Sequence, residues 1–336
     1  MRTLPRPSPH GRSVALTRTA CVVLLIGLLA SLSASPVLAN PGTVREFVLP
    51  TPHSGPSGIA TGTDGSAWFT EAATNRVGHL AAGSGITEFA IPTPSSSPAG
   101  IAPGPDGSVW FAETEGDRIG RIATEGTITE FPVPPCCGAG PVGPYGIAAG
   151  PDGAMWFTEF YASAIGRVTP GGAIAQYPLV PRQIYPRGIT AGPDGAMWFT
   201  DEAGIGRITT TGAITHYPLS NPYGISIVTG PDGNLWFAVS YSDQIGRITP
   251  SGRERLWDVN SACYPQGIAA GGDGALWFTC GTLDELGRIT LGGAISYRPV
   301  PSHPGGDFLD GITCAPDGSV WFTEASASRI GRMSTR

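Results

Sequence analysis

The sequence predicts an all-β fold, a seven-bladed β-propeller with four-stranded blades that is closed by its own N-terminal strand. The phrase Asp-Gly-x-x-Trp-Phe occurs seven times, with its tryptophan at positions 68, 110, 156, 198, 236, 277 and 321. Each copy spans about forty residues and holds four short β-prone runs, which is the period of a propeller blade. The 49 glycines and 33 prolines disfavour long helices throughout the chain.

Each part of the repeat corresponds to one element of a blade. Gly-Ile begins the first strand, and Asp-Gly forms a hairpin turn because both central turn positions need positive φ. Trp-Phe-Thr-Glu ends the second strand, Ile-Gly-Arg-Ile forms the third, and the run after the next Gly turn forms the fourth. A residue that recurs in every blade has the same role in each, so we interpret the Trp-Phe pairs as packing residues. The same interpretation covers Arg121, Arg167, Arg207, Arg247, Arg288 and Arg332.

The two ends of the repeat array predict how the ring closes. The last copy stops after its third strand, at residues 330–333. The missing fourth strand appears at the start of the array as residues 44–50, which match residues 128–134 of a complete copy. We therefore expect residues 40–336 to form one propeller whose N-terminal strand completes the last blade, leaving no open sheet edge between the first and last blades.

Residues 1–39 predict a signal peptide. Arg2, Arg6, Arg12 and Arg18 precede an apolar run over residues 20–30, and Val37 and Ala39 lie at the −3 and −1 positions of a cleavage site. A membrane-spanning helix needs about 20 apolar residues, so this run is too short to cross a bilayer. We expect a secreted, extracellular protein.

Charge limits the classes of partner. Removing the leader changes the formal net charge from −6 to −10, and every basic residue is an arginine. An acidic chain without a basic run is a poor ligand for nucleic acids and anionic membranes. The absence of lysine excludes Schiff-base chemistry. We expect the partner to be a small cyclic peptide, a glycan or an extracellular protein, and the closed ring to be a monomer.

Function is expected on the rim where the first strand of each blade starts, because the long connectors between blades lie there too. The residues before Gly-Ile are Ser57, Ala99, Tyr145, Arg187, Tyr223, Gln266 and Asp310. They differ from blade to blade, as residues of a binding surface do. We predict that a ligand contacts the arc formed by Tyr145, Arg187 and Tyr223, together with Gln266.

A second ring of residues ends the second strands, and we expect it to face the first ring around the channel mouth. Its members are Glu71, Glu113, Glu159, Asp201, Val239, Cys280 and Glu324. One interpretation is that these acids accept hydrogen bonds from backbone N–H groups of the following loop. Asp310 and Glu324 belong to one blade, with Asp307 nearby, and two such carboxylates suit Mg²⁺ or Ca²⁺. We predict them as metal ligands and catalytic residues; the alternative is that they are solvated rim acids.

The run Gly-Pro-Asp-Gly-Ala-Met-Trp-Phe-Thr-Glu at 150–159, with Ile-Gly-Arg at 165–167, resembles the repeat of the virginiamycin B lyase family, the streptogramin lyases. The resemblance covers essentially all of residues 40–336. It implies a seven-bladed propeller that inactivates cyclic depsipeptide antibiotics of the streptogramin B type by Mg²⁺-dependent elimination at the ester. It also implies a His base directly before a Gly-Ile on the rim, with acidic metal ligands nearby.

The sequence departs from that pattern at the base. It contains no His-Gly-Ile, and the matching positions in the last two blades hold Gln266 and Asp310, whereas Glu324 matches the family's acidic strand end. Two function classes therefore stay open. One is a metal-assisted lyase or a related hydrolase, in which Asp310 acts as the base if its pKa is raised or if the metal strongly acidifies the α-proton. The other is an extracellular recognition propeller, which the absence of the rim histidine favours.

The cysteines predict one disulfide within a blade. Cys263 precedes the first strand and Cys280 ends the second strand of the same blade, so we expect these two residues to pair. Cys136 and Cys137 are adjacent and either bond to each other or pair elsewhere. Cys314 lies inside a first strand and is expected to be a buried free thiol.

Overall fold

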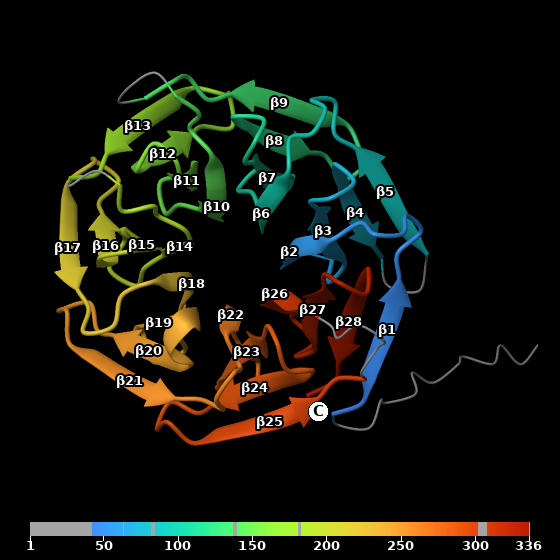
Figure 1. Ribbon diagram of the computed structural model, residues 1–336. Helices are drawn as coiled ribbons and strands as arrows, with labels where there is room; N and C mark the ends of the chain where they lie inside the picture. The colour runs from blue at the N-terminus through green and yellow to red at the C-terminus, as the bar shows by residue number, and fades with distance from the viewer. Residues whose placement is uncertain are drawn as a thin grey trace, which may run out of the picture. The chain divides into compact units, whose positions relative to one another are not determined.

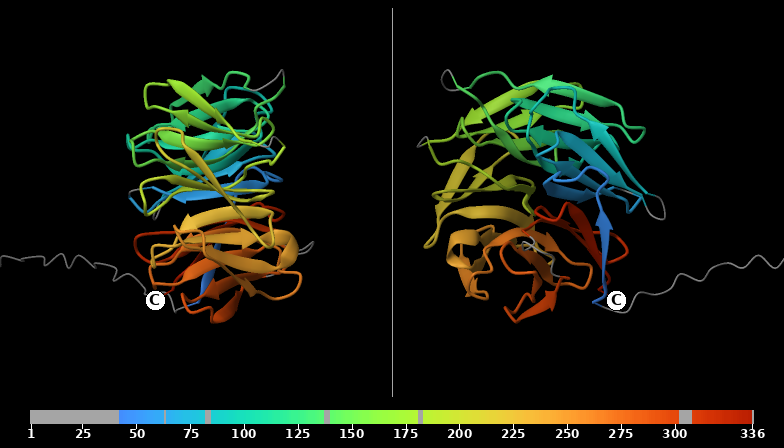
Figure 2. Two further views of the ribbon diagram at one scale, coloured as in Figure 1. Left: turned by 90° about the vertical axis from the view of Figure 1, so that its left-hand side faces the viewer. Right: turned by 45° about the vertical axis from the view of Figure 1, so that its right-hand side comes forward.

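The computed structural model describes residues 42–62, 64–81, 85–136, 140–180, 183–301 and 308–335. These residues form seven four-stranded antiparallel sheets set around a central axis, with the first strand of each sheet innermost (Figure 1). Side views show the sheets next to one another around that axis, with loops projecting at both faces (Figure 2). The predicted fold class is confirmed. The predicted leader lies outside the described residues, and within them no helix is long and apolar enough to cross a membrane.

The strands follow one another along the chain, four to a blade. Blade 1 contains β2 (Pro56–Thr61), β3 (Ala67–Glu71), β4 (Arg76–Leu80) and β5 (Ile86–Ala90). Blade 2 contains β6 (Pro98–Pro103), β7 (Val109–Glu113), β8 (Arg118–Ile122) and β9 (Ile128–Pro132). Blade 3 contains β10 (Pro144–Ala149), β11 (Met155–Glu159), β12 (Ala164–Val168) and β13 (Ile174–Pro178). Blade 4 contains β14 (Ile189–Ala191), β15 (Met197–Asp201), β16 (Gly204–Ile208) and β17 (Ile214–Pro218).

The remaining blades repeat this order. Blade 5 contains β18 (Gly224–Thr229), β19 (Leu235–Val239), the short 3-10 helix η1 (Ser240–Ser242), β20 (Gln244–Ile248) and β21 (Glu254–Asp258). Blade 6 contains β22 (Pro265–Ala270), β23 (Leu276–Cys280), β24 (Glu285–Ile289) and β25 (Ile295–Pro299). Blade 7 contains β26 (Leu309–Cys314), β27 (Val320–Glu324), β28 (Arg329–Met333) and, as its outer strand, β1 (Val44–Val48).

The ring closes in the way that was predicted from the two ends of the repeat array. Strand β1 pairs antiparallel with β28, so that Val44 lies opposite Met333 and Val48 lies opposite Arg329 (Figure 1). An ion pair joins the two strands, with Arg329 Nη1 2.9 Å from Glu46 Oε2. The first and last segments of the propeller therefore share one sheet.

The repeated Trp-Phe pairs pack within and between blades, which confirms their predicted role. A Cβ atom at Gly78 would lie only 2.1 Å from the Phe69 ring, so this aromatic residue requires the glycine of Ile-Gly-Arg beside it. The tryptophan, on the other face of the sheet, stacks on an aromatic residue of the outer strand, as Trp110 does on Phe131 at 5.4 Å between ring centroids. Trp110 also belongs to a buried cluster with Met155 of the next blade. The aromatic residues therefore hold each blade to its neighbour.

The arginine of Ile-Gly-Arg is structural in six blades, as predicted. It pairs with the aspartate of the Asp-Gly turn in its own blade; Arg167 Nε, for example, lies 2.6 Å from Asp152 Oδ2. The six pairs are Arg121–Asp106, Arg167–Asp152, Arg207–Asp194, Arg247–Asp232, Arg288–Asp273 and Arg332–Asp317. In blade 1 the arginine is replaced by His79.

The predicted disulfide between Cys263 and Cys280 is present, and both residues are fully buried. Cys314 is a free thiol of intermediate exposure, and burial raises its pKa to about 12. Cys137 lies outside the described residues, so the alternatives for the adjacent cysteines stay open.

Candidate functional site

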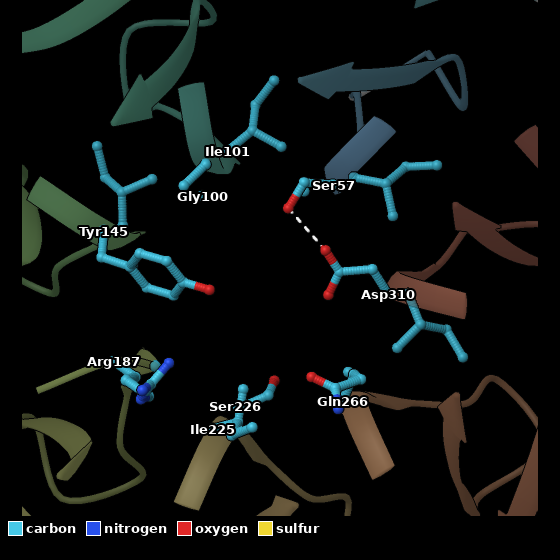
Figure 3. A pocket seen from close by; sticks show the side chains of 18 of the residues that line it. Ser57, Gly100, Ile101, Tyr145, Arg187, Ile225, Ser226, Gln266 and Asp310 are labelled. Carbon is cyan, nitrogen blue, oxygen red and sulfur yellow. Dashed lines mark hydrogen bonds between the residues drawn. The ribbon is translucent and has the colours of Figure 1, made fainter. Parts of the chain in front are cut away.

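The candidate site is a cavity of about 180 Å³ at the axis, where the innermost strands begin. Each innermost strand has an isoleucine nine residues before its tryptophan, and the residue two places before that isoleucine lines the cavity (Figure 3). We call these seven residues the axial ring: Ser57, Ala99, Tyr145, Arg187, Ile225, Gln266 and Asp310. Six of its seven members are those predicted from the repeat.

The prediction for blade 5 was wrong in register. Tyr223 precedes a Gly-Ile pair, but Ile227 lies opposite Phe237 in the sheet, where the other blades place the isoleucine of Gly-Ile. Ile225 therefore takes the axial position, and Tyr223 lies two residues earlier, 45% exposed on the rim. The constant spacing of nine residues to the tryptophan identifies the correct isoleucine, whereas the local Tyr-Gly-Ile motif does not.

In the five blades that contain Trp-Phe-Thr, a threonine fixes the backbone of the axial ring, whereas blades 2 and 5 have alanine at this position. The threonine of Trp-Phe-Thr accepts a hydrogen bond from the Gly-Ile glycine of its own blade and donates one to the axial carbonyl of the next blade. Thr158 Oγ1 accepts from Gly146 N at 2.8 Å and donates to Arg187 O at 2.7 Å. The backbones approach so closely that a Cβ atom on Gly146 would lie 2.2 Å from that carbonyl oxygen. This bridge makes the ring a rigid frame for variable side chains.

Asp310 is the acid of the axial ring. Its Oδ2 accepts a 2.7 Å hydrogen bond from Ser57 Oγ, and the carboxyl group faces Tyr145 across the cavity (Figure 3). Burial raises the pKa of Asp310 above its usual value, and the hydrogen bond from Ser57 opposes that shift only in part. The site therefore contains a carboxyl group that holds its proton more tightly than a solvated aspartate does.

Tyr145 and Arg187 form the opposite side of the cavity. Burial, with the Asp310 charge, raises the pKa of Tyr145, whereas the Arg187 charge lowers it. The guanidinium carbon of Arg187 lies 4.9 Å from the centre of the Phe160 ring, within cation–π range. Phe160 in turn contacts Tyr145, with ring centroids 6.0 Å apart. These three side chains thus form one aromatic and cationic wall.

Gln266 is held by two hydrogen bonds. Its Nε2 donates to Ser240 Oγ at 2.9 Å and to the carbonyl oxygen of Tyr264 at 3.0 Å. The amide group is thereby fixed at the edge of the cavity between Asp310 and Ser226 (Figure 3).

An arc of aromatic residues lies above one half of the axial ring, and of its members only Tyr223 was predicted from the sequence. The residues two places before the ring are Gly55, Ser97 and Gly143 in blades 1–3, but Tyr185, Tyr223, Tyr264 and Phe308 in blades 4–7. We call these last four the aromatic arc. Tyr223, Tyr264 and Phe308 are 45%, 40% and 38% exposed. The Tyr-Pro pairs at 185–186 and 264–265, directly before ring residues, were the available signal.

Three tyrosines of this arc adopt a backbone conformation that bulky residues rarely take. The φ angles of Tyr185, Tyr223 and Tyr264 are 41°, 77° and 46°. Such positions cost on the order of 1 kcal/mol each for a residue with a side chain. Glycine occupies the same place with positive φ at residues 55 and 143. Ser97 of blade 2 has positive φ there as well, so this turn is a feature of the connector, and blades 4, 5 and 6 place a strained tyrosine on it.

The second predicted ring does not surround the cavity. Glu324 and the equivalent Glu71, Glu113, Glu159 and Asp201 are completely buried, and none of them lines the axial cavity. The reason is the strand period of two, which places Glu324 on the same buried face as Phe322. The structure therefore contradicts the prediction that these acids face the channel mouth, and they are not solvated.

In blades 1–4, the acid at the end of the second strand meets a residue of the outer strand. Glu113 lies near Glu130 in blade 2, and Asp201 binds His216 at 3.0 Å in blade 4. Burial, aided by the charge of a glutamate on the outer strand, raises the pKa of Glu71 to about 7 and that of Glu113 to about 8. Burial also raises the pKa of Glu159 to about 7. These contacts lie in the blade interiors, away from the axis.

The described residues do not fit the predicted Mg²⁺ or Ca²⁺ site. Asp310 is the only carboxylate among the described residues that line the cavity, because Glu324 is buried inside its blade. In the described part of the chain, no group of three or more His, Cys, Asp or Glu side chains could hold a metal ion. Asp307 lies outside the described residues. Asp310 and Ser57 therefore form a hydrogen-bonded pair of a carboxyl group and a hydroxyl group.

Together, the fold and the axial cavity define a seven-bladed propeller with a ligand-sized site at one end of its channel. A family model, the virginiamycin B lyase family, matches residues 36–143 and 141–225. No curated protein matches the chain. The chain belongs to the virginiamycin B lyase family.

Solved structures agree with this assignment. A streptogramin B lyase structure is 36% identical, with a TM-score of 0.82 over 87% of this chain and 97% of that one. The virginiamycin B lyase of Staphylococcus aureus is 33% identical, with a TM-score of 0.81 over 87% of this chain and 99% of its own. A catalytically inactive His-to-Ala variant of that enzyme has been solved with quinupristin at the same identity and coverage. The hydrazine synthase of Kuenenia stuttgartiensis, at 16% identity, shares the fold alone.

Proposed function

We propose that the protein is an exported, monomeric propeller that recognises a small cyclic peptide at the rim of its axial cavity. The observation that carries this proposal is the aromatic arc, where exposed aromatic side chains occupy one half of the rim above a polar ring. Rigid aromatic side chains supply contact area at a low cost in conformational entropy. Quinupristin binding by the S. aureus relative supports the choice of ligand class.

The axial ring supplies the polar part of recognition. Arg187 offers N–H donors to peptide carbonyl groups. Gln266, whose two N–H groups already bond within the protein, offers its side-chain carbonyl oxygen to a peptide N–H. Asp310 accepts hydrogen bonds or, when protonated, donates one. These groups are held by Phe160, Ser240 and Ser57, so little side-chain freedom is lost when a ligand binds. A cyclic ligand also carries a low ordering cost of its own.

A second candidate function is a lyase that linearises a streptogramin B-type depsipeptide. It is favoured by family membership and by Asp310, a buried carboxyl group whose raised pKa suits proton abstraction. In such a step Asp310 takes the α-proton, the carbon–oxygen bond of the ester breaks, and the ester oxygen leaves as a carboxylate. No histidine is found among the described residues that line the cavity, which favours binding over catalysis.

One experiment separates the two functions. The protein is incubated with a streptogramin B depsipeptide, with and without Mg²⁺, and followed by calorimetry and fragmentation mass spectrometry. We expect binding without turnover, and a loss of about tenfold in affinity for Arg187→Ala, as for a lost charge-assisted hydrogen bond. Linearisation at unchanged mass that disappears in Asp310→Asn would establish the lyase instead.

The control for this experiment is Arg167→Ala, which removes a cation from the opposite end of blade 3 and should leave binding unchanged. If no depsipeptide binds and Arg187→Ala behaves like the parent, the proposed ligand class is wrong.

A further inference from the structure

A second cavity lies between blades 1 and 2, at the opposite face from the axial ring. It has a volume of about 220 Å³ and is lined by Asp64, Trp68 and His79 of blade 1 and by Gly104, Ser108 and Thr124 of blade 2, among others. Its position in the repeat is where the other blades carry the arginine of Ile-Gly-Arg. In the six other blades the equivalent space is therefore occupied by an arginine side chain.

Blade 5 shows the filled form of the site. Arg247 Nη1 lies 3.3 Å from Asp232 Oδ2 and 3.5 Å from the carbonyl oxygen of Leu291 in the next blade. The guanidinium carbon lies 5.5 Å from the centre of the Trp236 ring. The residues of blades 1 and 2 at these three positions are Asp64, Thr124 and Trp68, and all three line the cavity.

Blade 7 is the nearest match in sequence. Ser319 donates to Asp317 Oδ1 from its N–H and its hydroxyl group, and Arg332 Nη2 bonds to Asp317 Oδ2 at 2.5 Å. In blade 1, Ser66 makes the same two bonds to Asp64 Oδ1. Both bonds from Ser66 go to Oδ1, whereas Oδ2 is the oxygen that receives the arginine in the other blades. The carboxylate is thus oriented for an arginine that blade 1 lacks.

His79 is too short to replace that arginine. Its ring stacks on Trp68, with centroids 4.0 Å apart, and its buried Nε2 has no hydrogen-bond partner among the described residues. The imidazole therefore covers the tryptophan but does not reach the carboxylate, and the space that a guanidinium group spans elsewhere is left as the cavity.

We propose that the cavity between blades 1 and 2 binds a guanidinium group from outside the chain, carried by a peptide arginine or by a small guanidine. Asp64 Oδ2 accepts an N–H of the guanidinium group, as the equivalent oxygen does from the arginine in other blades. The imidazole of His79 provides a flat surface for stacking, and the Thr124 carbonyl oxygen accepts a further N–H. A guanidinium group is planar and has donors on several sides, whereas an ammonium group is a compact point charge. The site should therefore prefer arginine to lysine.

The test uses nuclear magnetic resonance of the purified protein and follows the indole N–H of Trp68 and the backbone amide of Gly104. The probes are agmatine, the peptide acetyl-Gly-Arg-Gly-amide and its lysine counterpart. We expect saturable shifts with an affinity on the order of millimolar, since the ion pair is partly exposed. The lysine peptide should bind at least about fivefold more weakly. Equal affinity for the arginine and lysine peptides would overturn the proposal.

Two matched variants test the location of the site. His79→Arg fills the cavity with the chain's own arginine, as in the other six blades, and should abolish the response. Arg121→His creates the same vacancy in blade 2 and should produce a second response at Trp110, the equivalent tryptophan. A titration that is unchanged in His79→Arg would overturn the proposal.

The probes also separate the two sources of the guanidinium group. If agmatine and the arginine peptide bind with the same affinity, the guanidine group itself is the ligand. At least threefold tighter binding of the peptide would identify an arginine in a polypeptide. Because this cavity lies on the opposite face from the axial ring, the result is independent of whether a depsipeptide binds there.

Discussion

The axial ring and the residues at the ends of the second strands occupy equivalent places in all seven blades, yet they vary in different ways. Axial residues change from blade to blade while the threonine bridges below them recur, as Thr158 illustrates. At the ends of the second strands, the residue type differs between blades together with the residues that surround it on the third and fourth strands. Glu113 of blade 2 has Arg118 and Glu130 beside it, whereas Val239 of blade 5 has Gln244 and Leu256. Joint change within a blade indicates packing, and independent change on a common frame indicates ligand recognition.

The largest effect is expected from breaking the charge balance of one strand-end cluster. Arg118→Ala removes the cation next to the fully buried Glu113 and leaves the half-buried Glu130 beside it. The free energy of unfolding should fall by about 2 kcal/mol, because Glu113 loses the charge that opposes its desolvation and the repulsion from Glu130. Urea unfolding at pH 7 measures it. Arg187→Ala in the axial ring is the matched control and should change stability by less than about 1 kcal/mol; the opposite ranking would reverse the roles assigned to the two regions.

The same clusters predict how stability depends on pH. Glu71, Glu113 and Glu159 have folded pKa values of about 7, 8 and 7, above the unfolded value of 4.5. Folded protein therefore retains protons that unfolded protein releases, so the stability that these three groups contribute is fully present below about pH 4.5 and is lost as pH rises through 8. Each group contributes a slope of roughly 1 kcal/mol per pH unit within this window. Burial lowers the pKa of His79, so this one group makes stability rise with pH and opposes the effect of the three glutamates.

Chemical unfolding at several values between pH 5 and 8.5 measures this slope. Glu113→Gln should reduce it, whereas Asp106→Asn, in a turn outside the clusters, should not. A stability that is constant over this range would contradict the assigned protonation states.

A smaller effect is expected when blade 2 receives the residues of blade 5. The variant combines three substitutions: Glu113→Val, Arg118→Gln and Glu130→Leu. In this variant an apolar contact replaces the charged groups of the cluster. Such exchanges are often neutral or stabilising. Thr93, which donates two hydrogen bonds to Glu130, loses its acceptor. The unfolding free energy should therefore stay within about 1 kcal/mol of the parent value, and depsipeptide binding should be unchanged; a loss as large as that of Arg118→Ala would show that the blades are not interchangeable.

The smallest effect on stability is expected in the aromatic arc. Tyr223→Gly removes an exposed side chain that contacts Tyr241, and it relieves the strain of a φ angle of 77°. Stability should change by no more than about 0.5 kcal/mol, whereas ligand affinity falls several-fold. Calorimetric binding and urea unfolding of this one variant test both statements. A large loss of stability with unchanged binding would make Tyr223 a packing residue.

The repeat made most of the fold predictable from the sequence, because a Trp-Phe pair recurs about every forty residues and marks each blade without any long-range information. The closing strand was predictable for the same reason, as residues 44–50 match a complete copy. Within the site, Tyr223 was misplaced because a local Tyr-Gly-Ile motif imitates the repeat two residues out of register. The orientation of Glu324 was available from strand alternation with Phe322. The residues that surround the buried acids were not predictable, because they come from distant parts of the chain. Glu46 and Arg329, for example, are bonded to each other in blade 7 but are 283 positions apart.

The pairing of β1 with β28 also sets an order of events during synthesis. The strand that completes the ring is made first and its partner last, so six blades can form while this strand waits unpaired. Loop-closure entropy grows only slowly with length, so the long wait costs little free energy, but it delays the final step until the last residues emerge. A chain shortened by a few residues at either end would lose strands from the same blade. Truncations of fewer than ten residues at the N-terminal or C-terminal end of the propeller should therefore cause the same defect, an unsealed gap between blades 6 and 1.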